Sequence, residues 1–177
     1  YSVNVYFPLG VSKTKDATIA YESLNKDLVI KAINNLSEYK LIIDALFGFN
    51  FNKPFNERTH ILINSLNKTS VEKVAIDVPS GVYCDNGKID KIAFKANRTL
   101  ALHRLKPCHV LLPGKEYSGQ ITLLDIKIAN LDKKTTVQLI KRPSLKLPTH
   151  QMHKYSRGEL LIIASREMFG ASKLTTL

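Results

Sequence analysis

Two apolar runs that each end in an aspartate constrain the fold of this chain most. In LIIDALFG the run over Leu41–Ile43 ends at Asp44, and in VAIDVPSG the run over Val74–Ile76 ends at Asp77. Short apolar runs without polar alternation are typical of strands in a parallel sheet, where both faces are covered by helices. We therefore expect an α/β fold in which both strands are buried on both faces.

The rest of the chain supplies the other elements of such a fold. Strand-like segments over 2–7, 98–103 and 119–128 add to the two apolar runs. Helices are expected over 16–28 and 60–68. The second helix should bury one stripe of residues, formed by Ile61, Leu62, Ser65 and Leu66.

The two aspartates should lie on the same edge of the sheet. Ligands of parallel α/β sheets bind beyond the carboxyl ends of the strands. Neighbouring strand tips place side chains roughly 5–10 Å apart, because strands are spaced by about 4.8 Å. One carboxylate could then bind a cation while the other moves protons. The same residues could also form ordinary turns capped by aspartate. The pattern therefore leaves open whether the aspartates form a binding site or only cap turns.

The loops after these strands have residues suited to a binding site. Gly48 and Asn50 tolerate positive φ, so their loop can turn tightly and direct backbone N–H groups at an anion. Ser80 follows Asp77 in a Pro-Ser-Gly turn, and the two could form a polar cup for a cation or a hydroxylated substrate. The chain has no GxGxxG or GxxxxGK[ST] motif, and its five histidines lack HExxH spacing, so each histidine is expected on the surface or in the core.

Composition narrows the class further. A chain of 177 residues with 44% apolar residues can bury a sizeable core, and no apolar run reaches the roughly 20 residues that span a bilayer. No secretory leader is recognisable, and Cys84 and Cys108 lack CxxC spacing, so we expect free thiols, a cytoplasmic protein and no membrane partner. The net charge of +11 indicates affinity for a phosphate-bearing ligand, and without an RNA-binding motif nucleic acid is not the expected partner.

Four segments together resemble the NAD(P)H-hydrate epimerase family, or YjeF N-terminal domain. They are LIIDALFGFNFNKPF, VAIDVPSGVYCDNG, ANRTLALHRLKP and LPGKEYSGQITLLDI, and the resemblance covers roughly residues 3–128. The tail HKYSRGELLIIASREMFGAS resembles the start of an ADP-dependent NAD(P)H-hydrate dehydratase domain. The predicted organisation is an epimerase domain over 1–128, a linker over 129–150, and the start of a dehydratase-like domain over 151–177, from which no dehydratase activity is expected.

The resemblance implies a Rossmann-like three-layer αβα fold, a mainly parallel sheet, and epimerisation of the R and S forms of hydrated NADH and NADPH. Asp77 would be the substrate-binding acid and base. Asp44 and Ser80 would bind a potassium ion. A homodimer is implied, because members of that family commonly pair. The loop that would hold the phosphate and ribose of the substrate comprises Gly48, Phe49, Asn50, Phe51, Asn52, Lys53 and Pro54.

The chain departs from the family pattern in two places. It reads GFNF where the family often has GTGL, and the family's Asn-Asn-Gly-Gly-Asp-Gly loop is absent because the sequence begins on the strand after it. Without that first strand and phosphate loop, apolar surface should be exposed at the gap. Two alternatives to an active isomerase stay open: a non-catalytic nucleotide- or RNA-binding scaffold of the same fold, and an inactive gene fragment.

Overall fold

The chain divides into two units, and the helices and strands described below all lie in the first. The computed structural model describes residues 2–129, 137–144, 149–153, 156, 161–163 and 170. Contacts separate unit 1, Tyr1–Asn130, from unit 2, Leu131–Leu177. Most of the predicted linker and dehydratase-like segment falls outside the described residues, so that domain division stays a prediction.

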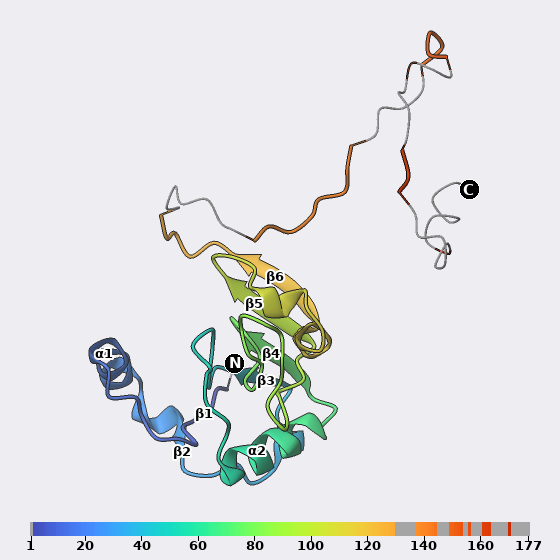
Figure 1. The fold of residues 1–177 in the computed structure, drawn as a ribbon. Helices are drawn as coiled ribbons and strands as arrows, with labels where there is room; N and C mark the ends of the chain where they lie inside the picture. The colour runs from blue at the N-terminus through green and yellow to red at the C-terminus, as the bar shows by residue number, and fades with distance from the viewer. Residues whose placement is uncertain are drawn as a thin grey trace. The chain divides into compact units, whose positions relative to one another are not determined.

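A four-stranded parallel sheet forms the centre of unit 1 (Figure 1). Its order is β3 (Leu41–Asp44), β4 (Glu72–Ile76), β5 (Arg98–Leu102) and β6 (Gln120–Leu124). Each strand pairs with the next in parallel register, and Asp44 at the end of β3 pairs with the backbone of β4. All four strands were predicted, and the mixed α/β class with a parallel sheet is confirmed.

Helix α2 (Glu57–Asn67) connects β3 to β4 and packs on one face of the sheet. It starts where the Asn56 side chain accepts a hydrogen bond from the Thr59 amide at 2.9 Å. The predicted stripe is wrong in part, because Ile61 is 59% exposed and Ser65 is also exposed. The helix instead buries the row with i, i+4, i+7 spacing, which is Thr59, Ile63 and Leu66.

The sheet is buried more deeply on one face than on the other. The core beneath α2 contains Phe51, Phe55, Ile63, Leu66, Ala75, Phe94 and Ala96. On the opposite face of β3, Leu41 and Ile43 are 46% and 59% exposed, because alternate residues of a strand point to opposite faces. The expectation that this strand is buried on both faces is therefore wrong for the described residues.

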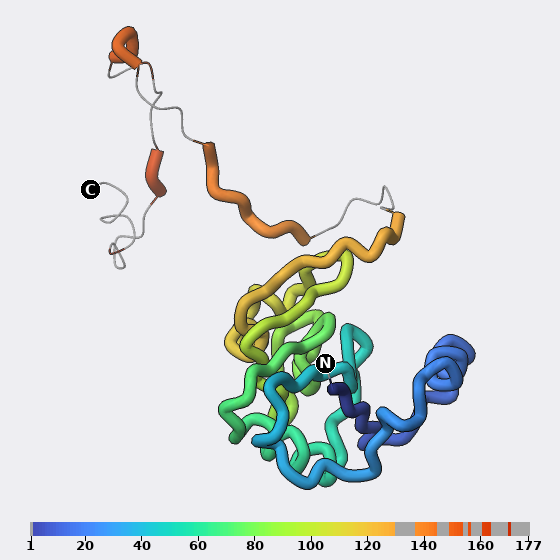
Figure 2. Tube along the Cα trace, turned by 180° about the vertical axis from the view of Figure 1, so that it is seen from behind, coloured from blue at the N-terminus to red at the C-terminus, as the bar shows by residue number. Residues whose placement is uncertain are grey.

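A separate two-stranded sheet lies beside the edge of β3. It pairs β1 (Val5–Tyr6) with β2 (Val29–Ile30) in parallel, and β2 was not predicted. Helix α1 (Lys15–Ser23) buries no residue and stands away from the four-stranded sheet in both views (Figures 1 and 2). A pocket of about 150 Å³ opens between the small sheet and β3, and most of the residues that line it are apolar. The exposure expected at the gap left by a missing first strand stays a prediction.

Short turns complete unit 1. The 3₁₀ turns η1 (Lys26–Leu28) and η2 (Leu36–Glu38) flank β2, while η3 (Pro107–His109) and helix α3 (Gly114–Ser118) connect β5 to β6. The Leu112–Pro113 peptide bond is cis. Cys84 and Cys108 are free thiols, as predicted, and both are buried.

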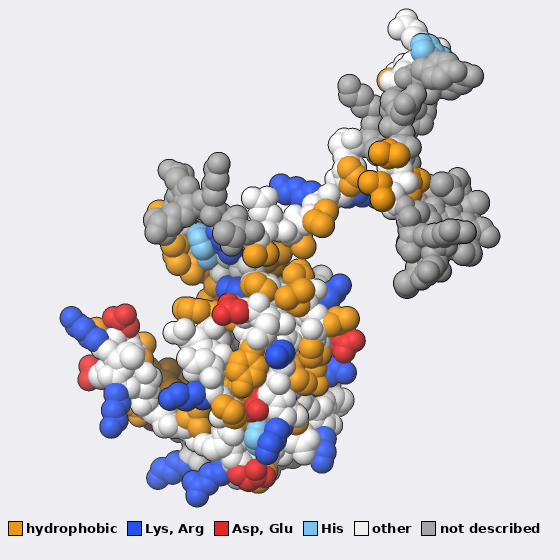
Figure 3. Space-filling model, viewed as in Figure 1, with side chains coloured by type: hydrophobic (Ala, Val, Ile, Leu, Met, Phe, Trp, Pro, Cys, Tyr) orange, Lys and Arg blue, Asp and Glu red, His pale blue; other side chains and the backbone are white. Residues whose placement is uncertain are grey.

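The surface carries dispersed positive charge. Lys and Arg side chains are spread over the face of unit 1 shown in Figure 3 and do not gather into one stripe. Within the described part of the chain, no helix is both long enough and apolar enough to cross a bilayer.

Substitution of Gly81 by alanine should destabilise the fold strongly. Gly81 has a φ of +94°, and an added Cβ would lie 2.7 Å from the Ile92 carbonyl oxygen and 2.9 Å from the Ala93 Cα. We expect the free energy of unfolding to fall by about 2–4 kcal/mol, from backbone strain and overlap together. Denaturant titration measures this change.

Gly10 offers a matched control for that measurement. It also has a positive φ, of +77°, but an added Cβ would meet nothing within 4 Å. Gly10→Ala should therefore lower the free energy of unfolding only through backbone strain, by about 1 kcal/mol. Equal losses in the two variants would contradict the role assigned to close packing around Gly81.

Candidate active site

Asp44 and Ser80 join the ends of two neighbouring strands. One oxygen of the Asp44 carboxylate accepts the Ser80 amide at 2.7 Å, and the other accepts the Ser80 hydroxyl at 2.6 Å and the Leu46 amide at 3.2 Å. Asp44 is 4% exposed, and its burial raises the pKa of the carboxyl group. Among the described residues, no Lys, Arg or His side chain forms an ion pair with it.

Asp77 occupies a strained turn directly after β4. Its φ is +68°, and the Val78 amide donates to the Ile76 carbonyl at 2.9 Å, so Asp77 is the central residue of a γ-turn. The form with positive φ at its centre is the rarer and more strained one. The Asp77 amide donates to the Leu100 carbonyl of β5 at 2.9 Å, which anchors the turn to the sheet. Strained backbone of this kind is concentrated at functional sites.

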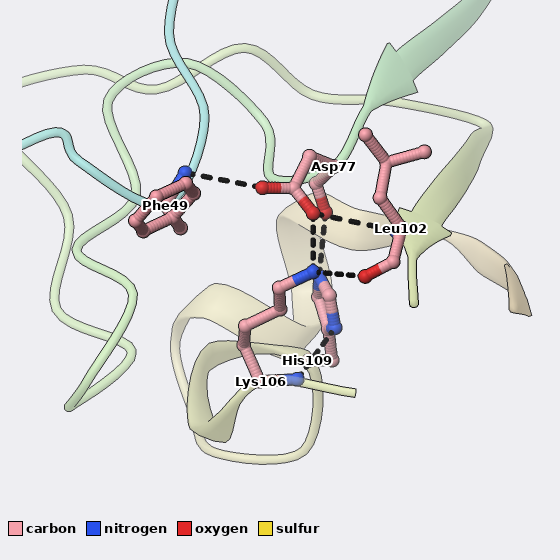
Figure 4. Close-up of polar contacts among 5 residues, drawn as sticks. All are labelled: Phe49, Asp77, Leu102, Lys106 and His109. Atoms are coloured by element: carbon pink, nitrogen blue, oxygen red, sulfur yellow. Dashed lines mark hydrogen bonds and ion pairs between the residues drawn. The ribbon is translucent and has the colours of Figure 1, made fainter. Parts of the chain in front are cut away.

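The turn directs the Asp77 carboxylate toward three donors from two other segments (Figure 4). One carboxylate oxygen accepts the Lys106 ammonium group and the Leu102 amide, the latter at 3.3 Å. The other oxygen accepts the Phe49 amide at 3.2 Å. Asp77 is only 6% exposed. The carboxylate is thus held between the loop after β3 and the segment after β5.

Lys106 and His109 complete the cluster around Asp77. The Lys106 ammonium also donates to the Leu102 carbonyl at 2.7 Å, and its side chain is 17% exposed. His109 Nε2 lies 2.9 Å from the Asp77 carbonyl oxygen, and His109 Nδ1 accepts the Lys106 amide at 3.1 Å. These partners require a neutral ring protonated at Nε2. Burial lowers the pKa of His109, which agrees with a neutral ring.

The loop after β3 approaches Asp77 closely. A Cβ on Gly48 would lie 3.2 Å from the carboxylate of Asp77, so glycine lets the loop reach the acid. The Phe51 amide donates to the Gly48 carbonyl at 3.1 Å, which closes a tight turn. Neither Gly48 nor Asn50 has a positive φ, so the predicted reason for this turn is wrong. The turn forms with ordinary backbone angles, as the commonest β-turns do.

The predicted binding loop is divided between core and surface. The Phe51 side chain is 5% exposed and packs with the rings of Phe47, Phe55 and Tyr83. The Phe49 side chain is 62% exposed. Other exposed loop residues are Asn50, Asn52, Lys53 and Pro54. The aromatic anchor holds the loop in place, and its polar side chains face solvent.

Loop amides point inward as well. The Phe47 amide donates to the Ser80 hydroxyl at 3.1 Å, and the Phe49 amide is bonded to Asp77. These two N–H groups therefore bond side chains of the site, one a hydroxyl and the other a carboxylate. The pocket beside β3 is lined by Asp44 but not by Asp77.

Sequence reasoning found Asp44, Asp77 and Ser80 but missed two neighbours. Lys106 falls within the segment ANRTLALHRLKP but was given no role, and His109 was expected on the surface or in the core. Their position three residues apart in a turn after a strand is a weak signal. His109 becomes informative only once the fold brings its ring to the backbone of Asp77.

Parallel strands with acidic residues at their carboxyl ends, closed over by short loops, define an α/β protein of the Rossmann-like class. Residues 5–108 match the family described as YjeF-related protein N-terminus. This match covers more than half of the chain, and the chain belongs to that family.

Named relatives agree with this assignment. The chain is 32% identical over its whole length to the bifunctional NAD(P)H-hydrate repair enzyme Nnr of Synechocystis, of which it covers 36%. It is 29% identical, over 56% of its length, to the NAD(P)H-hydrate epimerase of Oenococcus oeni, of which it covers 47%. The chain thus spans about a third to a half of these relatives.

A solved structure supports the fold. The crystal structure of yeast ynu0, YNL200c, matches 71% of this chain and 54% of its own, with a TM-score of 0.54 and 23% identity. At that identity the match supports the architecture alone.

His109 should make stability depend on pH below its ordinary pKa of 6.5. Between the lowered pKa of the folded state and 6.5, the unfolded chain binds a proton that the folded chain does not. The free energy of unfolding therefore rises with pH through this window. As the pH falls through it, the protein loses that contribution to its stability. The charged groups that face the ring are Lys106 and Asp77.

Denaturant titrations of the parent and of His109→Gln from pH 5 to 7.5 check this prediction. The difference in unfolding free energy between the two should shrink as pH falls. A difference that stays constant across the range would show that His109 is not buried in its neutral form.

Proposed function

We propose that the protein containing this chain interconverts the R and S forms of hydrated NADH and NADPH. Relatives named NAD(P)H-hydrate epimerase in Oenococcus oeni, Pirellula staleyi and Levilactobacillus brevis support this reaction. The single observation that carries the proposal is the Asp77 carboxylate, held at the strand tip by a strained turn and three donors. A non-catalytic scaffold is less favoured, because these relatives are named as enzymes.

Asp77 would move the proton in both halves of the reaction. The carbon that bears the hydroxyl is also bonded to the ring nitrogen. Asp77, which the site holds as a carboxylate, first takes up a proton from solvent. When it gives that proton to the hydroxyl, the C–O bond breaks, water leaves, and the nitrogen lone pair forms an iminium. Water then adds to the other face and returns its proton to the carboxylate. One carboxyl group therefore serves as acid and then as base.

The geometry also indicates how substrate would reach the acid. Asp77 is covered by the Phe49 amide on one side and by the Lys106 ammonium on the other. The nicotinamide ring would displace the Phe49 contact, since Phe49 lies in a surface loop and its side chain is exposed. The Lys106 ammonium has three N–H groups, of which two have acceptors among the described residues, so one remains to bind the hydroxyl.

The loop Gly48–Pro54 is proposed to hold the phosphate and ribose of the substrate. Its exposed Lys53 side chain supplies a positive charge, and Asn50 and Asn52 supply amide donors. A cytoplasmic location, expected from the cysteine usage, and a homodimer, implied by the resemblance to the epimerase family, also remain proposals.

A potassium ion at Asp44 and Ser80 is the remaining proposal from the sequence. Both residues offer oxygen atoms, which hard cations prefer. Burial raises the pKa of Asp44, and a nearby positive charge would stabilise its ionised form. Two side chains cannot complete a coordination shell, so backbone carbonyls or water would supply the other ligands. No cluster of three or more His, Cys, Asp or Glu occurs among the described residues. The ion would organise the loops and carry no step of the reaction.

Replacement of Asp77 by asparagine should abolish most of the activity. Loss of an acid and base costs about 10²- to 10⁴-fold in rate, so kcat of Asp77→Asn should fall at least 100-fold. The assay follows interconversion of separated R and S hydrates by the intact gene product. Asp90→Asn is the matched control, because Asp90 also accepts a backbone amide, from Phe55, and contacts a basic side chain, His60. Equal activity in parent and Asp77→Asn would refute the proposal.

Potassium should raise the melting temperature of the parent and not of Asp44→Asn. At ten times its dissociation constant, a bound ion adds about 1.4 kcal/mol, or about 3–6 °C in Tm. Thermal melts compare KCl with LiCl at equal ionic strength, and Asp90→Asn should retain the parent's response. Identical melts in both salts would argue against a selective ion site at Asp44.

A further inference from the structure

One imidazole connects the two segments that carry the acid and the ammonium of the site. Asp77 follows β4, and Lys106 precedes the η3 turn after β5. His109, the last residue of η3, bonds the backbone of both: its Nε2 reaches the Asp77 carbonyl, and its Nδ1 accepts the Lys106 amide. Figure 4 shows the ring between the two.

We propose that His109 is a positioning residue for Asp77, because its imidazole bonds the backbone of Asp77 and of Lys106 at once. It thereby fixes the position of the Asp77 carboxylate relative to the Lys106 ammonium. Among the described residues, the hydrogen bonds of the ring go to these backbone groups and not to the carboxylate or the ammonium. It acts on the two peptide groups from which these side chains extend.

The Asp77 bond has a particular consequence. The γ-turn at Asp77 keeps a non-glycine residue at a φ of +68°, which most side chains avoid. A donor on the Asp77 carbonyl opposes rotation of that peptide out of the turn. His109 is 1% exposed, so no water competes readily for this carbonyl. A buried carbonyl without its donor would itself be costly, which favours the strained conformation while the ring is present.

The Lys106 bond has a second consequence. By accepting the Lys106 amide, Nδ1 fixes the start of η3, in the manner of a side chain that caps a helix. The Lys106 stem then leaves the backbone at a set position, from which its ammonium reaches both Asp77 and the Leu102 carbonyl. The distance between acid and ammonium therefore depends on one rigid ring.

Two substitutions of His109 test its bond to Asp77 and its bond to Lys106 separately. In His109→Gln the amide NH₂ can replace the Nε2 donor to Asp77 while the acceptor for Lys106 is lost. In His109→Asn the shorter carbonyl can replace the Nδ1 acceptor while the donor to Asp77 is lost. His60→Gln is the control, since His60 also bonds a polar partner, Asp90, at 3.0 Å but lies outside the site.

The first measurement does not depend on the reaction. Imidazole ¹⁵N spectra of the intact gene product should show His109 protonated at Nε2. Backbone couplings should show a positive φ at Asp77 in the parent, in His60→Gln and in His109→Gln, and a negative φ in His109→Asn. A positive φ that persists in His109→Asn, or protonation at Nδ1 in the parent, would overturn the inference even if the protein proves to be an active epimerase.

The second measurement rests on the proposed epimerase function. Misplacement of a reacting group by about 1 Å can cost 10²-fold, so kcat should fall about 10- to 100-fold in His109→Asn, with KM within about twofold. His60→Gln should keep the parent's kcat. A folded His109→Asn with unchanged kcat would overturn the inference, whereas absence of activity in the parent would count against the proposed function alone.

Discussion

The hydrogen bonds between the Asp44 carboxylate and Ser80 support the rest of the site. They tie the end of β3 to the turn after β4, and the Ser80 hydroxyl then accepts the Phe47 amide of the loop. Burial of a carboxylate costs several kcal/mol, but hydrogen bonds to a charged group contribute about 1.5–3 kcal/mol each. Three such bonds to Asp44 offset part of that cost, and burial still raises the pKa of its carboxyl group. Gly48 is thereby brought against Asp77.

A γ-turn follows each of two neighbouring strands, β4 and β5. His103 after β5 has a φ of +62°, and the Arg104 amide donates to the Leu102 carbonyl at 2.7 Å, which repeats the γ-turn at Asp77. Each turned residue also donates its amide to the next strand, Asp77 to Leu100 and His103 to Leu124. Strain at such positions costs about 1–3 kcal/mol, and these inter-strand bonds help to offset it. The turn after β5 leads the chain back toward Asp77, where Lys106 and His109 meet it.

Much of this arrangement could be predicted from the sequence, for an identifiable reason. Apolar runs that end in Asp44 and Asp77 predict adjacent strand tips because parallel strands share one carboxyl edge. The γ-turn could not be predicted, since its φ at Asp77 is maintained by contacts from segments distant in sequence. The buried row of α2 was assigned incorrectly because neighbouring apolar residues allow two faces, and only packing against Phe94 and Ala75 selects Ile63. Whether a face of β3 is exposed depends on which other elements pack on it. The apolar residues of β3 do not by themselves predict this.

The two acids of the site differ in their partners, and this difference supports different roles. Asp77 has an ammonium group beside it, so its charge is balanced within the site. Among the described residues, Asp44 is bonded only to neutral donors, the Ser80 hydroxyl and two amides, while it is buried to a similar degree. A buried acid bonded only to neutral donors gains most from an added cation, whereas an acid already paired with lysine gains little. The difference supports the proposal that Asp44 binds the cation and that Asp77, whose carboxylate lies beside the Lys106 ammonium, transfers the proton.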